Sequence, residues 1–160
     1  MSVVDEILAF WAAPRRSVRA RLDQGVREDR ALARLMGACA LIFLAQWPGL
    51  ARAARIDPAI PLDARLGGAL LAILVLLPLL AHVLAGVSHL VARLVGGRGT
   101  GHGARVALFG AMLAIAPAML LHGLVLGLAG PGGLHTALGV VVLTAFAVLW
   151  GAALFEAERG

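Results

Sequence analysis

Long apolar stretches without a charged residue dominate the pattern of this chain. No Asp, Glu, Lys or Arg occurs between Arg65 and Arg93, and none occurs between Arg105 and Glu156. Crossing a hydrocarbon layer of about 30 Å takes roughly 20 helical residues, so the second stretch is long enough for two crossings. It is interrupted by Gly-Pro-Gly-Gly at residues 130–133, a sequence that ends a helix. The pattern therefore predicts membrane-spanning helices, two of which form a tight antiparallel hairpin.

Four segments meet the length and polarity criteria for a span. They cover residues 35–51, 66–90, 106–129 and 134–155. The first is the shortest, and the arginines at both of its ends have side chains long enough to reach the lipid headgroups. We therefore predict an all-α fold, in which residues 34–160 form a polytopic four-transmembrane-helix bundle.

Residues 1–33 carry a different, amphipathic pattern. Apolar residues recur at helical spacing from Val3 to Trp11, with Asp5 and Glu6 opposite, and again after Pro14 among six arginines. One or two helices are expected here, and two placements are open. The helices lie on the cytoplasmic membrane surface in contact with anionic lipid, or their apolar stripe packs under the bundle while the arginines only set the topology.

Composition supports a membrane protein. The 160 residues are 61% hydrophobic and only 14% charged, which is outside the range of soluble globular domains. The formal charge of +5 is not interpreted as a nucleic-acid surface, because most arginines flank apolar runs. The single cysteine, Cys39, excludes an internal disulfide and a CxxC site, and we expect it to pack as a small apolar residue.

The distribution of arginines predicts the orientation. If the four spans are correct, the N-terminal segment, the connector around residues 96–105 and the C-terminus hold 11 of the 14 arginines, whereas the loop from Arg52 to Arg65 holds 3. The positive-inside rule then places both termini and the connector in the cytoplasm of a bacterium, with the bundle in its inner membrane. A cleaved signal peptide is not expected, because the first thirteen residues contain Asp5 and Glu6 but no basic residue.

The connector also carries a family resemblance. Residues 89–100 read His-Leu-Val-Ala-Arg-Leu-Val-Gly-Gly-Arg-Gly-Thr. This segment resembles the bacterial branch of the Yip (Ypt-interacting protein) family, in which an apolar-basic-apolar stretch runs into Gly-Gly-basic-Gly-Ser/Thr and the next span contains a mid-membrane proline. The matching residues are Arg93, Gly96, Gly97, Arg98, Gly99, Thr100 and Pro117.

The resemblance implies a polytopic helical membrane protein. Eukaryotic members of the family bind small GTPases and act in vesicle trafficking, but they usually have five spans and a longer acidic cytoplasmic segment with tyrosines. This chain has four predicted spans and no tyrosine. GTPase binding is therefore not expected, and we predict a non-enzymatic protein that organises or scaffolds membrane or membrane-protein complexes.

Two prolines lie near the midplane of predicted spans. Pro78 and Pro117 each remove a backbone hydrogen bond, which frees the carbonyls of Leu74 and Leu113. Broken helices at the midplane form the binding sites of many transporters. The alternative prediction is therefore a small transporter or channel that uses the Pro78 and Pro117 region, although a kink that serves packing is the more common role of such a proline.

Small residues predict close helix packing in the third span. Ala107, Ala111, Ala114 and Ala118 form a stripe at helical spacing, and Gly123 with Gly127 forms a GxxxG pattern. The partner of these surfaces could be the second span, the fourth span or another copy of the protein. Protein partners or self-association are accordingly expected.

The remaining candidate chemistry is weak. His82 and His89 are about 10 Å apart along a helix, which is too far for one metal ion. His122 is predicted at another depth of the membrane. His89 and His102 form only a loose pair. We predict no metal or cofactor, and histidines that bond to neighbouring carbonyls. Ser88 and His89 point about 100° apart on a helix, so they do not form a catalytic pair. The glycine-rich connector lacks a phosphate-loop pattern and is interpreted as a flexible turn.

Overall fold

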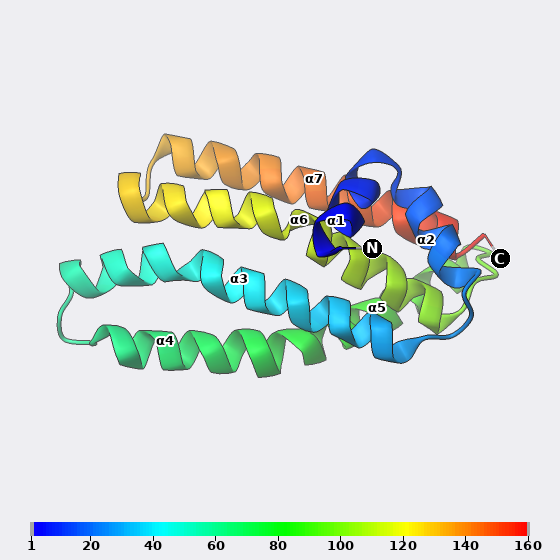
Figure 1. Ribbon diagram of the computed structural model, residues 1–160, viewed down its shortest axis with the longest axis horizontal. Helices are drawn as coiled ribbons and strands as arrows, with labels where there is room; N and C mark the ends of the chain where they lie inside the picture. The colour runs from blue at the N-terminus through cyan, green and yellow to red at the C-terminus, as the bar shows by residue number, and fades with distance from the viewer. Residues whose placement is uncertain (1, 160) are drawn as a thin grey trace.

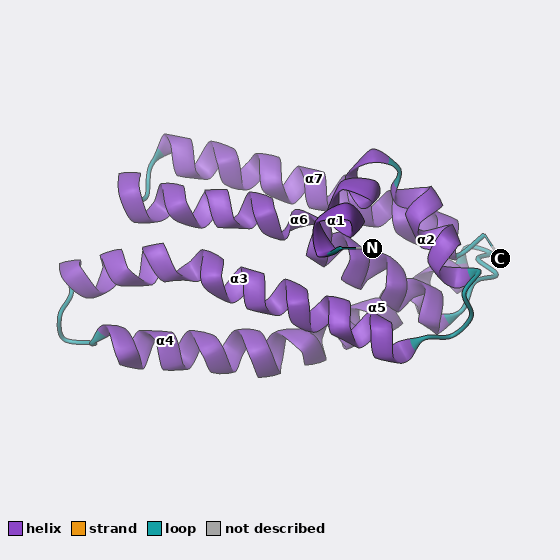
Figure 2. Cartoon of the chain, viewed as in Figure 1, coloured by secondary structure: helices purple, strands orange, loops and turns teal. Residues whose placement is uncertain are grey.

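The computed structural model describes residues 2–159, and every regular element in that range is helical (Figures 1 and 2). This confirms the predicted all-α class. Four helical stretches are long and apolar enough to cross a membrane, namely residues 28–56, 62–94, 101–129 and 133–157. The elements are α1 (Val3–Ala12), α2 (Pro14–Leu22), α3 (Glu28–Ile56), α4 (Leu62–Leu71), the π-helical turn η1 (Ala72–Leu76), α5 (Leu77–Leu94), α6 (Gly101–Ala129) and α7 (Gly133–Ala157).

The first long helix extends far beyond the predicted segment 35–51. Helix α3 contains 29 residues, which at 1.5 Å per residue is about 43 Å. It passes through Pro48 and ends at Ile56. Hydropathy marks only the apolar part of a helix, whereas arginine and alanine on its flanks are strong helix formers that continue the backbone hydrogen bonds. The loop predicted between Arg52 and Arg65 is correspondingly short and covers residues 57–61.

The long helices run side by side and define two ends of the molecule. In Figure 1 the C-terminus and the connector between α5 and α6 lie at one end, which we call the termini end, and the N-terminus lies further inward in the same half of the molecule. The loop after α3 and the loop after α6 lie at the opposite end, which we call the loop end. Helix α3 is antiparallel to α4, and α6 is antiparallel to α7.

Helix α6 forms the centre of the bundle. Residues 102–116 are buried with the exception of the partly exposed Arg105, whereas the half of the helix near the loop end is more open. The most extensive contacts of α6 are with α3. A methyl group added at Gly123 would overlap the carbonyl oxygen of Ala45, and one added at Gly127 would overlap Pro48. The GxxxG surface therefore packs on the first span, a neighbour that was not among those expected.

The N-terminal helices dock on α6 and α7. Phe10 of α1 and Val18 of α2 are completely buried, and Arg19 of α2 forms an ion pair of 3.0 Å with Glu156 of α7. Of the two placements left open by the sequence, the structure therefore shows packing against the bundle. The outer face of α1 is nevertheless apolar and exposed, because Val4 and Leu8, four residues apart on one face, are each more than half accessible.

A wide helical turn precedes Pro78. The N–H of Leu77 bonds to the carbonyl of Ala72, five residues back, which is the π-helical spacing. Nδ1 of His82 lies 2.8 Å from the carbonyl oxygen of Pro78. This contact is the histidine–carbonyl bond expected from the sequence, and His82 also packs edge-on against Phe109 with ring centroids 5.0 Å apart.

The second midhelix proline lies beside a contact from the N-terminus. The indole Nε1 of Trp11 donates a 2.7 Å hydrogen bond to the carbonyl of Ala114. The residue before it, Leu113, has a carbonyl without its usual N–H donor, because residue 117 is a proline. The indole therefore binds the backbone of α6 at the turn where proline disturbs the helix. Helix α1 and the turn at Pro117 are coupled by this bond.

Replacing Trp11 with phenylalanine is expected to destabilise the protein. The change keeps most of the ring but removes the indole hydrogen bond to the Ala114 carbonyl, and a lost hydrogen bond costs about 0.5–1.5 kcal/mol. Thermal unfolding of the purified protein in detergent measures the loss. Trp47→Phe is the matched control, because Trp47 is exposed to the same extent as Trp11 but only its ring makes a contact, with Phe43. Equal melting temperatures for the two variants would contradict the assigned role of Trp11.

Candidate functional site: an arginine-lined pocket

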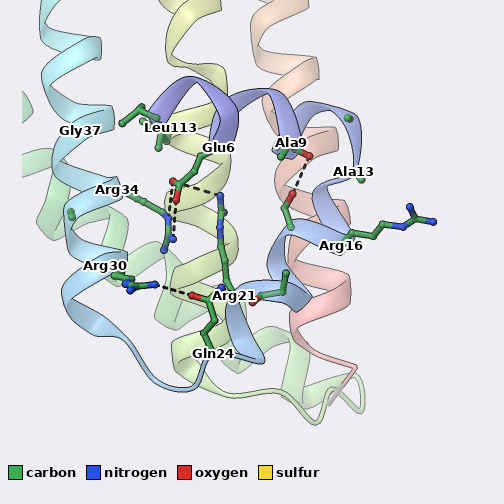
Figure 3. A pocket seen from close by; sticks show the side chains of 15 residues that line it. Glu6, Ala9, Ala13, Arg16, Arg21, Gln24, Arg30, Arg34, Gly37 and Leu113 are labelled. Carbon is green, nitrogen blue, oxygen red and sulfur yellow. Dashed lines mark hydrogen bonds and ion pairs between the residues drawn. The ribbon is translucent and has the colours of Figure 1, made fainter. Parts of the chain in front are cut away.

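A pocket of about 780 Å³ lies between α1, α2 and α3 near the termini end (Figure 3). We call it the arginine pocket. Leu113 of α6 contributes to its lining, and alanines and Gly37 form much of the remaining wall. The polar side chains that line it are Glu6, Arg16, Ser17, Arg21, Gln24, Arg30 and Arg34.

Helical spacing explains why these residues line one space. On α3, Arg30, Ala33, Arg34 and Gly37 follow the i, i+3, i+4, i+7 positions of a single face. Helices α1 and α2 also contribute alanines at positions 9, 12 and 20, which are too small to fill the gap between the helices. The pocket therefore combines a hollow left by small side chains with long cationic side chains around it.

A single carboxylate lies between two buried guanidinium groups. Arg34 donates from Nε and Nη2 to the two oxygens of Glu6 at 3.2 and 3.3 Å. Nη2 of Arg21 approaches the same carboxylate at 3.9 Å. The side chains of Arg21, Arg34 and Glu6 are 10%, 12% and 23% exposed. Figure 3 shows the two arginines reaching Glu6 from different helices.

Arg21 is the least satisfied member of this group. Its Nη1 is buried and has no hydrogen-bond partner within residues 2–159. Burial, together with the charge of Arg34, lowers the pKa of Arg21 to about 10, and Glu6 partly opposes both effects. The guanidinium is therefore charged at neutral pH. It lies 5.2 Å from the ring centroid of Phe10, a cation–π contact that replaces part of its lost hydration.

The pocket has more positive than negative charge. Four arginines line it with one glutamate. Arg30 donates to Gln24, which is neutral, and Arg16 extends away from the group around Glu6 (Figure 3). Guanidinium groups bind carboxylate and phosphate oxygens through paired N–H donors. The arrangement is therefore suited to binding an anion, and it contains no nucleophile–base pair that would indicate catalysis.

The glycine-rich connector forms the predicted turn, but its backbone is fixed by close contacts at two of its glycines. A methyl group at Gly97 would lie 2.9 Å from the carbonyl oxygen of Ala92, and one at Gly99 would overlap the backbone of Ala157. The N–H of Arg98 donates to the carbonyl of Glu158 at 2.8 Å. Gly97 is therefore required for close approach to the end of α5, and Gly99 for close approach to α7.

The other residues of the Yip-like motif lie around this contact and on α6. Thr100 is the N-cap of α6, and its hydroxyl accepts from the N–H of Gly103 at 3.2 Å. Gly96 has a φ of +94°, a conformation that favours glycine. Arg93 and Arg98 are exposed. Pro117 lies within α6, away from the connector.

The histidines near the termini end have separate acidic partners. Nδ1 of His89 lies 2.7 Å from Glu158, and Nδ1 of His102 lies 2.9 Å from Glu28. Glu28 also binds Arg105. The loose pair of His89 and His102 considered from the sequence is thus split between two helix contacts. Within the described residues, no group of three or more His, Cys, Asp or Glu side chains is placed to hold a metal ion.

Sequence reasoning missed two arrangements. His122 and His135 stack with ring centroids 4.1 Å apart across the α6–α7 hairpin, a contact that depends on the register of the two helices. The arginine pocket was also missed, because Glu6, Arg21 and Arg34 come from three helices. The only local signal was the spacing of Arg30 and Arg34 on one face of a predicted helix.

No protein-family model, no curated protein and no solved structure matches this chain. The arginine pocket and its position in the bundle are therefore the basis for proposing a function.

Proposed function

We propose that the chain is a non-enzymatic, multi-pass protein of the bacterial inner membrane that holds an anionic phospholipid headgroup in the arginine pocket. Through this contact it organises the surrounding membrane or a membrane-protein complex. The observation that carries the proposal is Arg21, whose buried guanidinium has an Nη1 without a partner in a pocket with excess positive charge. A phosphate group supplies both the missing acceptor and the missing negative charge.

Membrane placement is supported by the surface of the long helices. Large apolar side chains are exposed along η1, α5 and α7, including Leu79, Val83, Val141 and Leu143, each at least 60% accessible. In water such a surface would be an aggregation hazard, whereas in a bilayer it faces acyl chains. The excess of arginines at the termini end supports a cytoplasmic location for that end.

The arginine pocket lies where a headgroup is expected. Val3 belongs to the lining of the pocket and is exposed, and Val4 and Leu8 form an exposed apolar face on the same helix. Helix α1 therefore presents an apolar face next to a cationic hollow. This combination matches an anionic phospholipid, with its phosphate at the guanidinium groups and its acyl chains along α1.

The resemblance of residues 89–100 to the Yip family supports the same type of protein, a polytopic membrane protein without an enzymatic centre. The transporter alternative depends on Pro78 and Pro117. The contacts seen near these prolines are bonds from His82 and Trp11 to backbone carbonyls, which are packing contacts. We therefore favour the organising role over transport.

Lipid retention by the purified protein tests the proposal. In native mass spectrometry from mixed micelles, we expect phosphatidylglycerol to be retained more strongly than phosphatidylcholine. Arg21→Gln should lower the apparent affinity for phosphatidylglycerol about tenfold or more, since a hydrogen bond to a charged group contributes about 1.5–3 kcal/mol. The variant keeps the Glu6–Arg34 pair, so the fold should be retained.

Arg55→Gln is the matched control, because Arg55 is an exposed arginine of α3 near the loop end. This variant should retain phosphatidylglycerol like the unaltered protein. The proposed function fails if both lipids are retained equally, or if Arg21→Gln binds phosphatidylglycerol as well as Arg55→Gln does.

A further inference from the structure

A second pocket, of about 620 Å³, lies at the termini end between the glycine-rich connector and the last turns of α7. We call it the connector pocket. Its walls differ from those of the arginine pocket, because a buried carboxylate contributes to it. Gly97 and Arg98 line it from the connector, and Leu154, Phe155, Glu158 and Arg159 line it from α7 and the residues after it.

Glu158 is the least satisfied group of this pocket. Its side chain is only 6% exposed, and its Oε1 lies 2.7 Å from Nδ1 of His89. The other oxygen, Oε2, is buried and has no hydrogen-bond partner within residues 2–159. A buried carboxylate oxygen without a donor is costly, so this position favours a ligand that brings N–H groups.

Gly97 lies close to that oxygen. A methyl group at Gly97 would lie 3.2 Å from Glu158 Oε2 and 2.9 Å from the carbonyl oxygen of Ala92, so a larger residue would crowd the carboxylate. The Ala92 carbonyl already accepts a hydrogen bond from the N–H of Gly97 at 2.8 Å, which leaves Glu158 Oε2 as the acceptor without a donor. A primary ammonium has N–H donors and a positive charge, which match an anionic acceptor.

The rim of the connector pocket has the opposite charge. Arg98 and Arg159 are both exposed there, next to the apolar side chains of Val95, Leu154 and Phe155. A ligand that fits this order of groups has an ammonium inside, a phosphate at the rim and an apolar tail along α5 and α7. A phosphate linked to a primary ammonium, carried on a diacyl lipid, has these three parts.

We propose that the connector pocket binds the phosphoethanolamine headgroup of a zwitterionic phospholipid, with the ammonium donating to Glu158 Oε2 and the phosphate accepting from Arg98 and Arg159. His89 positions the carboxylate through Oε1. The inference rests on the membrane placement proposed above, but it is independent of the arginine pocket, since the two pockets have no lining residue in common.

Headgroup selectivity of the unaltered full-length protein provides the first test. Phosphatidylethanolamine and phosphatidylcholine differ in that the quaternary ammonium of choline has no N–H donor. In native mass spectrometry from mixed micelles with matched acyl chains, we expect phosphatidylethanolamine to be retained about tenfold more strongly. Equal retention of these two lipids would overturn the proposal, and this comparison requires no variant.

Variants then locate the site. Glu158→Gln is expected to reduce retention of phosphatidylethanolamine to the level of phosphatidylcholine and to leave phosphatidylglycerol retention unchanged. Asp63→Asn is the control, because it removes the same charge from an exposed residue of α4 that lies outside the pocket lining. It should keep the ethanolamine preference. Loss of the preference in both variants, or in neither, contradicts the assignment to Glu158.

Competition with a soluble headgroup tests whether the pocket binds a lipid or free phosphoethanolamine. Glycerophosphoethanolamine added at the same concentration as the lipid should displace little phosphatidylethanolamine, because it lacks the tail that contacts α5 and α7. Efficient displacement would show that the pocket takes the free headgroup and would overturn the lipid assignment. Failure of the arginine-pocket proposal would instead appear as phosphatidylglycerol retention that Arg21→Gln does not change.

Discussion

Gly123→Ala is expected to lower the free energy of unfolding by about 3 kcal/mol, because the added methyl overlaps the backbone of α3. The atom that it meets is the carbonyl oxygen of Ala45, which is held in a helix and cannot rotate away as a side chain would. Helices α3 and α6 must therefore move apart along their most extensive contact. Unfolding by sodium dodecyl sulfate in mixed micelles, followed by tryptophan fluorescence, measures the change.

Gly151→Ala serves as the control for this experiment. Gly151 is a helical glycine of α7, and a methyl added there meets no heavy atom within 4 Å. Its replacement should leave stability unchanged or raise it by up to about 1 kcal/mol through the better helix propensity of alanine. If the Gly123 and Gly151 variants unfold at the same detergent fraction, the packing assigned to the GxxxG surface is wrong.

Glu6→Gln is the second substitution with a large expected effect. Glu6 is the acidic partner of both Arg21 and Arg34, so the variant leaves two largely buried guanidinium groups without a counter-charge. Removing one partner from a buried ion group costs about 3 kcal/mol. The repulsion between the two arginines should loosen α1 and α2 first, since they are joined to α3 through Glu6.

Hydrogen exchange of residues 3–22 is the measurement that isolates this effect. Exchange should become faster in α1 and α2 of the Glu6→Gln variant, whereas the hairpin of α6 and α7 near the loop end stays protected. The double variant Glu6→Gln with Arg34→Gln removes one charge of each sign and should recover part of the loss. Asp23→Gln is the control, because Asp23 is exposed and forms no ion pair in the described residues. A Glu6 variant that exchanges like the Asp23 variant would argue against the triad.

The long helices could be predicted from the sequence because long apolar runs without charged residues identify them. The run from Arg65 to Arg93 and the hairpin around Pro131 both correspond to such runs. Helix ends could not be placed in the same way. Glu28 and Arg55 lie inside α3. Charged residues end an apolar segment, but they do not end a helix, because they continue its backbone hydrogen bonds.

The neighbours of each helix were less predictable. Gly123 and Gly127 indicated close packing, but small residues permit approach without specifying which helix approaches. The glycines of the connector show the same ambiguity, since glycine serves both conformational freedom and close contact. At Gly96 the positive φ requires it, whereas at Gly97 and Gly99 a neighbouring backbone requires it.

The arginine pocket could not be predicted because its chemistry depends on tertiary structure. Glu6, Arg21 and Arg34 are unremarkable surface residues in an amphipathic pattern. They become a site only when α1 and α2 dock beside α3 and exclude water from the guanidinium groups. The sequence shows which residues are charged, but it does not show which of them are buried. Burial makes an unpaired charge costly.

The docking of α1 and α2 has a consequence for the order of assembly. These helices are synthesised before α6 and α7, which carry the surfaces that they cover. Until α6 has been translated, Trp11 lacks the carbonyl of Ala114, and until α7 has been translated, Arg19 lacks Glu156. The N-terminal segment therefore reaches its packed position only after the rest of the bundle has been made.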